Sequence, residues 1–171
     1  MDKLQEFKCI FYPDSIAVVG ASARKKTPGT RYTESLIKAG FKGAIYPVNP
    51  SGGEILGVKV YPDLKSIPGP VDYVIVCIIA SSIPQLLDDC AAKGVKALQI
   101  YTAGFRESGT EEGSRLEDEI ARRANMKGIR IVGPNCIGSY CPAVLMPYGP
   151  MGELGKAGSI AFIGQSGGHT G

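Results

Sequence analysis

Two hydrophobic patterns alternate along the chain. Short, continuous apolar runs are typical of strands that are covered on both faces of a parallel sheet. Between these runs, apolar residues recur every three to four positions, as on amphipathic helices. The pattern predicts an α/β fold, a Rossmann-like, doubly wound parallel sheet with right-handed crossovers. The expected strands are residues 15–21, 44–49, 72–79, 97–102 and 130–132.

Helix signals fill the intervals between these strands. A first helix is expected over residues 30–39, before Gly40. Ser82 and Gln85 have the spacing of a capping box, which would start a helix that ends at Gly94. The helix over residues 111–126 carries an apolar stripe and, on its polar side, the i,i+4 pairs Asp118–Arg122 and Glu119–Arg123. Residues 4–11 form a short lead-in, and residues 57–61 a short strand or extended arm.

The amino-acid composition of the chain changes after residue 141. Residues 142–158 are rich in proline and glycine and show no periodicity, which indicates a linker or wrapping loop. A fresh apolar run at residues 159–163 predicts another strand, and the sequence ends where its helix should begin. We therefore expect one complete domain at residues 1–141 and, at residues 159–171, the start of a truncated second, flavodoxin-like domain.

Composition narrows the class of protein. The 171 residues are 44% hydrophobic and 20% charged, so the chain can build a core. The net charge of +3 suits an anionic small ligand but is too weak to indicate nucleic acid. The longest apolar run, residues 74–80, is too short to span a bilayer. The five scattered cysteines lack metal-ligand spacing, so we expect no metal site and a reduced, cytoplasmic protein.

Ligands of open α/β sheets bind at the carboxyl ends of the strands. The segments that leave those ends are small, polar or rich in Gly and Pro, and we expect them to form the rim of one site. They are Gly20-Ala21-Ser22, Val48-Asn49-Pro50, Ile78-Ile79-Ala80, Thr102-Ala103-Gly104-Phe105 and Gly133-Pro134-Asn135-Cys136.

The residues at this rim favour a nucleotide with extra phosphate charge over NAD. A dinucleotide site needs an acidic residue after the second strand, and Asn49 and Pro50 stand there instead. The first turn carries a basic cluster, which could also be no more than a solvated loop. Its members are Arg24, Lys25, Lys26 and Arg31.

Six motifs, in order and spacing, resemble one family. They read FYPDSIAVVGAS, YPVNP, VDYVIVCIIA, TAGFRESG, GPNCIG and IAFIGQSGG. The chain is similar to the N-terminal coenzyme A-binding domain of NDP-forming acyl-CoA synthetases, relatives of the succinyl-CoA synthetase α subunit. The resemblance implies a multidomain ligase that interconverts acyl-CoA, ADP and phosphate with free acid, CoA and ATP. It also implies a phosphohistidine, and an ATP-grasp domain or subunit as the partner that holds ATP or ADP and Mg²⁺.

The resemblance assigns ligand contacts to positions of this chain. Gly20, Ala21 and Ser22 would meet the CoA phosphates, and Val48, Asn49 and Pro50 would flank the nucleotide. Ile78, Ile79 and Ala80 would flank the adenine and pantetheine, and Asn135 and Cys136 would lie near the thiol. Lys25, Lys26, Arg31, Thr102 and Gly104 complete the predicted CoA site. The chain departs from the family pattern at Ile79, usually proline, near Tyr32, commonly glycine, and at Gly164, usually serine.

Other functions compete with this interpretation. Residues 164–168 match the GxSxG nucleophile elbow, but no histidine follows at triad spacing, so a hydrolase is rejected. His169 lies before the expected phosphohistidine loop, and Cys136 has no neighbouring base, so neither is predicted to be catalytic. A stand-alone regulatory CoA- or nucleotide-binding module and an NAD(P)-binding domain remain alternatives. We expect a ligase fragment that is inactive alone and oligomeric in the full-length protein.

Overall fold

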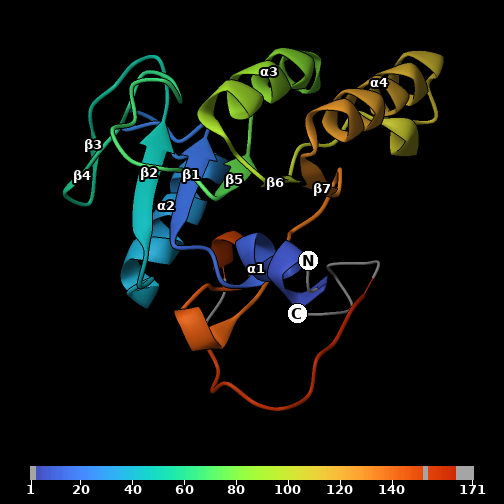
Figure 1. The fold of residues 1–171 in the computed structure, drawn as a ribbon. Helices are drawn as coiled ribbons and strands as arrows, with labels where there is room; N and C mark the ends of the chain where they lie inside the picture. Colours follow the sequence, from blue (N-terminus) through green and yellow to red (C-terminus); the bar gives the residue numbers. More distant parts are fainter. Residues whose placement is uncertain (1–2, 152–153, 165–171) are drawn as a thin grey trace.

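The predicted parallel sheet is present. The computed structural model describes residues 3–151 and 154–164, and for residues 3–6 and residue 151 it describes the backbone alone. Five parallel strands are paired in the order β2-β1-β5-β6-β7 (Figure 1). The chain thus reverses direction across the sheet between β2 and β5, as expected of a doubly wound fold. The strands are β1 Ser15–Val19, β2 Ala44–Val48, β5 Tyr73–Val76, β6 Ala97–Ile100 and β7 Arg130–Val132.

Helices cover both faces of the sheet. On one face, α3 (Ile83–Lys93) and α4 (Glu111–Lys127) pack on a core that includes Leu87, Leu98 and Ile120. On the other face, α1 (Lys3–Phe11) and α2 (Pro28–Ala39) enclose Ile10, Leu36 and Ile75. All residues of β1, β5 and β6 are buried, which explains why these strands read as uninterrupted apolar runs.

The helix starts differ from the sequence expectation at two places. Helix α2 begins at Pro28 rather than residue 30, because Thr27 is its N-cap and forms a capping box with Thr30. The predicted capping box at Ser82 is wrong. The 3₁₀ turn Ala80–Ser82 runs directly into α3, so Ser82 has helical φ and ψ angles and its side chain caps nothing.

Ion pairs on α4 follow the predicted pattern only in part. Arg123 lies 2.7 Å from Glu119, the expected i,i+4 partner. Asp118 instead contacts Arg106 at 2.5 Å, in the 3₁₀ turn Arg106–Ser108 before the helix. Arg106, which lies outside the helix, therefore pairs with the Asp118 carboxylate in place of Arg122, the partner predicted from the i,i+4 spacing.

A short arm blocks the β2 edge of the sheet. Where one strand or arm was expected, β3 (Glu54–Ile55) and β4 (Val58–Lys59) form a two-stranded antiparallel hairpin. The chain then returns to β2, where the Tyr61 N–H donates to the Pro47 carbonyl (2.8 Å) and the Tyr61 carbonyl accepts from the Asn49 N–H (2.8 Å). The outer backbone groups of β2 are therefore occupied at these positions.

The segment after β7 wraps around the domain. It contains the 3₁₀ turns Pro142–Val144 and Gly149–Met151 and buries Met146 against the α2 side of the core. The strand expected at residues 159–163 is not formed: residues 154–164 carry no helix or strand, and Ile160 and Ile163 are almost fully exposed. An isolated apolar strand is not stable without a paired neighbour, and residues 159–163 pair with no described strand. Ser166 and His169 lie outside the described residues.

Candidate functional site at the carboxyl end of the sheet

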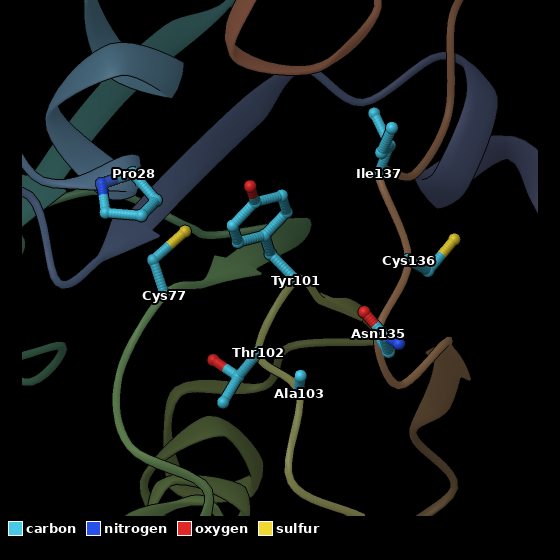
Figure 2. A pocket seen from close by; sticks show the side chains of 8 residues that line it. All are labelled: Pro28, Cys77, Tyr101, Thr102, Ala103, Asn135, Cys136 and Ile137. Carbon is cyan, nitrogen blue, oxygen red and sulfur yellow. The ribbon is translucent and has the colours of Figure 1, made fainter. Parts of the chain in front are cut away.

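A cavity of about 400 Å³ opens where strands β5, β6 and β7 end (Figure 2). This is the edge of the sheet at which the sequence placed the rim. Three predicted site residues line it: Thr102, Asn135 and Cys136. The other lining residues are Pro28, Cys77, Tyr101, Ala103 and Ile137.

The first βα turn depends on two glycines. Gly20 has a φ of +98°, and a Cβ there would lie 2.3 Å from the Cys77 carbonyl oxygen. A Cβ on Gly29 would lie 2.7 Å from the backbone carbon of Gly20. Glycine at both positions therefore lets α2 start directly against the ends of β1 and β5. The same approach brings Pro28 to the cavity wall.

Hydroxyl groups close this turn on itself. The Ser22 Oγ accepts from the N–H groups of Arg24 and Lys25, both at 3.2 Å, so the side chain holds the loop. Thr30 Oγ1 accepts from the Ser22 N–H and lies 2.9 Å from the carbonyl oxygens of both Ser22 and Lys25. Thr27 donates to the Gly20 carbonyl (2.8 Å). Ala21 is fully buried, so it supports the turn by packing in the core.

The four cations of the first turn are exposed and differ in their partners. Lys26 lies 3.4 Å from Glu34, on the next turn of α2, which neutralises part of its charge. Among the described residues, Arg24, Lys25 and Arg31 have no carboxylate within 4.0 Å. The loop therefore presents positive charge to solvent beside the cavity, with Lys25 less compensated than Lys26.

The end of β2 forms a local turn. The Asn49 side-chain oxygen accepts from the N–H (3.1 Å) and the hydroxyl (2.7 Å) of Ser51. Val48 is buried, whereas Pro50 is exposed. Of the three residues predicted here, Pro50 is the most accessible, and none of them lines the cavity.

The exits of β5 and β6 are tied together. The Thr102 hydroxyl donates to the Ile78 carbonyl (2.6 Å), so these two loops keep a fixed spacing. Ile79 is 70% exposed, so it presents an apolar surface at the exit of β5. Ala80 faces Gly104: a Cβ on that glycine would lie 3.7 Å from the Ala80 Cβ.

A carboxylate fixes the loop after β6. Glu107 accepts from the Gly104 N–H (2.7 Å) and from the Phe105 N–H (3.2 Å), while the Phe105 ring is fully buried. Desolvation opposes the charged form, but these amide bonds hold the pKa of the Glu107 carboxyl below its usual range. Glu107 could not be singled out from its sequence context, because its partners are backbone amides.

The loop after β7 lies across the cavity from Pro28. Asn135 has a left-handed backbone (φ +49°) and its N–H donates to the Thr102 carbonyl (3.1 Å), while the Cys136 N–H donates to the Ile100 carbonyl (3.1 Å). In Figure 2 the Cys77 sulfur points toward Pro28 and Tyr101, whereas the Cys136 side chain points away from the other labelled residues. Burial raises the pKa of the Cys77 thiol to about 12, which keeps it neutral.

Among the described residues, no group of three or more His, Cys, Asp or Glu side chains could hold a metal ion. Within the same ranges, no helix combines the length and apolar character that crossing a membrane requires. A cavity at the carboxyl ends of a doubly wound sheet, beside a glycine turn, a helix N-terminus and exposed cations, defines a nucleotide-binding domain of the Rossmann-like class.

A match to a protein-family model shows which kind of nucleotide-binding domain this is. The family model described as a CoA binding domain matches residues 14–142, so the chain belongs to the family of CoA-binding domains. The match spans all five strands and every loop that lines the cavity.

Similar proteins include ADP-forming acetate–CoA ligases. Subunit alpha of acetate–CoA ligase (ADP-forming) I from Pyrococcus furiosus is 42% identical over 166 residues, which are 94% of this chain and 35% of that subunit. A solved protein from Pyrococcus horikoshii superposes with a TM-score of 0.87 at 39% identity, covering 95% of this chain and 37% of that one. An acetyl-coenzyme A synthetase from Ca. Korarchaeum cryptofilum, solved with phosphate and ADP, gives a TM-score of 0.77 at 37% identity, covering 84% and 30%. The chain thus spans about a third of the length of these relatives.

Proposed function

We propose that this chain binds coenzyme A along the carboxyl edge of its sheet, with the pantetheine arm in the cavity. The observation that carries the proposal is the family match over residues 14–142, on a domain whose cavity is lined by residues of three of the sequence motifs, VDYVIVCIIA, TAGFRESG and GPNCIG. The phosphates of CoA would lie near Gly20 and Ser22, at the N-terminus of α2, where backbone N–H groups and the helix dipole favour anions.

The other predicted contacts follow the rim. Asn49 and Pro50 would flank the nucleotide, where an NAD site would place an acid. Ile79 supplies an exposed apolar surface, suited to the adenine or to the pantetheine. The arm would then pass Thr102 and Gly104 and bring the thiol toward Asn135 and Cys136. Lys25 and Arg31 would balance the phosphate charge, because neither has a carboxylate partner in the described structure.

We further propose that the chain acts as the CoA-binding part of an ADP-forming acyl-CoA synthetase. Such a ligase interconverts acyl-CoA, ADP and phosphate with a small organic acid, CoA and ATP. The identity to the Pyrococcus furiosus subunit supports this. An ATP-grasp domain or subunit of the same enzyme would hold ATP or ADP and Mg²⁺, in an oligomeric, cytoplasmic protein. The residues described here would bind and orient CoA.

Calorimetric titration of the chain with CoA, dephospho-CoA, NAD and ATP tests the binding proposal. We expect CoA to bind most tightly and dephospho-CoA more weakly, because the 3′-phosphate adds charge for the cations to meet. NAD binding as tight as CoA binding would contradict the proposal. Incubated with acetyl phosphate or ATP, the chain alone should neither gain phosphate nor form acyl-CoA, which mass spectrometry measures.

A further inference from the structure

One backbone carbonyl of the cavity wall accepts two side-chain hydrogen bonds from the core. The Ile137 carbonyl receives the Tyr32 hydroxyl at 2.7 Å and the Gln99 amide at 2.6 Å. Tyr32 comes from α2 and Gln99 from the middle of the sheet, 105 and 38 positions away in sequence. Both lone pairs of this oxygen are therefore occupied by elements that form the rigid frame of the domain.

The two donors are deeply buried and bonded to each other. Gln99 is 2% exposed and Tyr32 3%, and the Gln99 amide also donates to the Tyr32 hydroxyl (3.1 Å). Burial raises the pKa of Tyr32 above its ordinary value, so this phenol stays a proton donor. A buried glutamine in a parallel strand lowers stability unless every polar atom has a hydrogen-bond partner. Here the Gln99 amide nitrogen donates to Ile137 and Tyr32, and the side-chain oxygen accepts from the Tyr73 hydroxyl (3.4 Å).

The loop is pressed onto this network. A Cβ on Gly138, whose φ is +102°, would lie 1.8 Å from the Gln99 side-chain oxygen. Gly133 and Asn135 also have left-handed backbones, so the loop has a shape that few sequences adopt unaided. The ring of Tyr32 packs edge-on against Tyr101 at 5.5 Å, and Tyr101 and Ile137 both line the cavity.

We propose that Gln99 and Tyr32 are positioning residues that fix loop 133–139 and thereby set the affinity for the pantetheine end of CoA. This inference rests on the proposed function, since it takes CoA as the ligand. Neither residue lines the cavity, so each would act through Ile137 and Tyr101. Without the two donors, the wall from Asn135 to Ile137 would sample several positions and lose its preorganisation for the ligand.

The test compares two ligands on two variants. Gln99→Leu removes, at similar volume, the bond to the Ile137 carbonyl together with the bonds to Tyr32 and Tyr73, and Tyr32→Phe removes the other bond to Ile137. Loss of either bond to the Ile137 carbonyl should weaken CoA binding by about threefold to tenfold. Binding of adenosine 3′,5′-bisphosphate, which lacks the pantetheine arm, should change by less than about twofold. Amide hydrogen exchange over residues 133–139 should become faster in Gln99→Leu, which reports the loop without any ligand.

Ser15→Ala is the matched control. It removes a buried hydroxyl that bonds Asp72 at the opposite end of the sheet, so it should lower stability and leave CoA affinity unchanged. Equal losses for both ligands in Gln99→Leu, or no loss for CoA, would overturn the positioning role. If the wild type binds no CoA, the proposed function fails. The exchange data then decide the positioning role separately, because unchanged protection of residues 133–139 would refute it.

Discussion

The two loops that face each other across the cavity are built in opposite ways. The turn from Gly20 to Thr30 is held by its own side chains: Ser22, Thr27 and Thr30 bond the backbone within ten residues of themselves. The loop from residue 133 to residue 139 is held from outside, by Tyr32 and Gln99. Residues within the first loop therefore fix its geometry, whereas residues of the core fix the geometry of the second loop.

This difference separates two tasks of a ligand site. A self-bonded turn keeps its shape whatever the rest of the rim does, which suits recognition of a constant group such as a phosphate. A loop held by the core responds to changes in that core, so its end of the cavity can be retuned by residues that never touch the ligand. Substitutions in the two loops and in the wall between them should therefore separate these two tasks.

The largest expected effect is at the contact between α2 and β1. Gly29→Ala would place a Cβ 2.7 Å from the Gly20 backbone, so α2 must move away from the strand ends. We expect the free energy of unfolding to fall by about 2–4 kcal/mol, as for other overpacked backbone contacts. Urea denaturation measures the loss, and calorimetry should find CoA binding weakened more than tenfold.

Gly52→Ala provides the control for that substitution. Gly52 has a positive φ (+59°), which Gly29 does not, yet a Cβ on Gly52 meets nothing within 4 Å. Its replacement should cost only about 1 kcal/mol, from the left-handed backbone. If Gly29→Ala is no more destabilising than Gly52→Ala, the helix is not pressed against the strand ends as described.

An intermediate effect is expected from the charges of the first turn. Changing Lys25 and Lys26 together to alanine should weaken CoA binding roughly tenfold at low salt and flatten its salt dependence. Lys25→Ala alone should account for most of this, because Lys26 is paired with Glu34 at 3.4 Å. Calorimetry at two ionic strengths measures both quantities, and the turn's own hydrogen bonds should leave stability unchanged.

The double variant Lys8→Ala/Lys38→Ala makes the same change in net charge away from the cavity. It should leave CoA affinity within about twofold of the wild type. If both double variants weaken CoA equally, the effect comes from overall charge. If neither does, the basic cluster is a solvated loop and the backbone alone holds the phosphates.

The smallest effect concerns Cys77, on the wall between the two loops. Burial raises the pKa of its thiol to about 12, so only about one thiol in ten thousand is ionised at pH 8. Alkylation by iodoacetamide should be slow and should rise about tenfold per pH unit from 8 to 10 without levelling. Peptide mass spectrometry measures the rate, and a plateau below pH 9 would contradict the assignment.

Cys90 is the internal control for this measurement. Burial also raises the pKa of its thiol to about 12, but it lies in α3, away from the cavity. Both cysteines should react slowly, whereas saturating CoA should slow only Cys77. Equal protection of both would mean that CoA stabilises the whole domain rather than covering this wall.

The sequence predicted which strand ends form the site, but not every residue that lines the cavity. Apolar runs ending at small residues located the rim, and Thr102, Asn135 and Cys136 do line the cavity. Pro28 was missed because the helix start was placed at residue 30, past the Thr27 cap. An N-cap threonine followed by Pro and a second threonine at N3 is a signal that could have found it.

The remaining residues were missed for a different reason. Tyr101 and Cys77 sit at strand ends that were recognised, but strand alternation alone does not say which neighbour faces a cavity. The apolar pattern of residues 97–102 predicted a strand and did not single out Gln99. Its partners, Tyr32 and Ile137, are 67 and 38 positions away in sequence. A local pattern of apolar residues cannot predict contacts between residues so far apart.

The arm that returns along β2 bears on how this domain behaves at high concentration. A bare edge strand is a template on which another chain can add a strand, and so begin to aggregate. Pro47 has no N–H to offer, while its carbonyl and the Asn49 N–H are already bonded to Tyr61. Strand addition at this edge would first have to displace the arm and separate the Tyr46 and Tyr61 rings, which pack edge-to-face at 5.8 Å. The arm thus protects the sheet against fibrous self-association on that side.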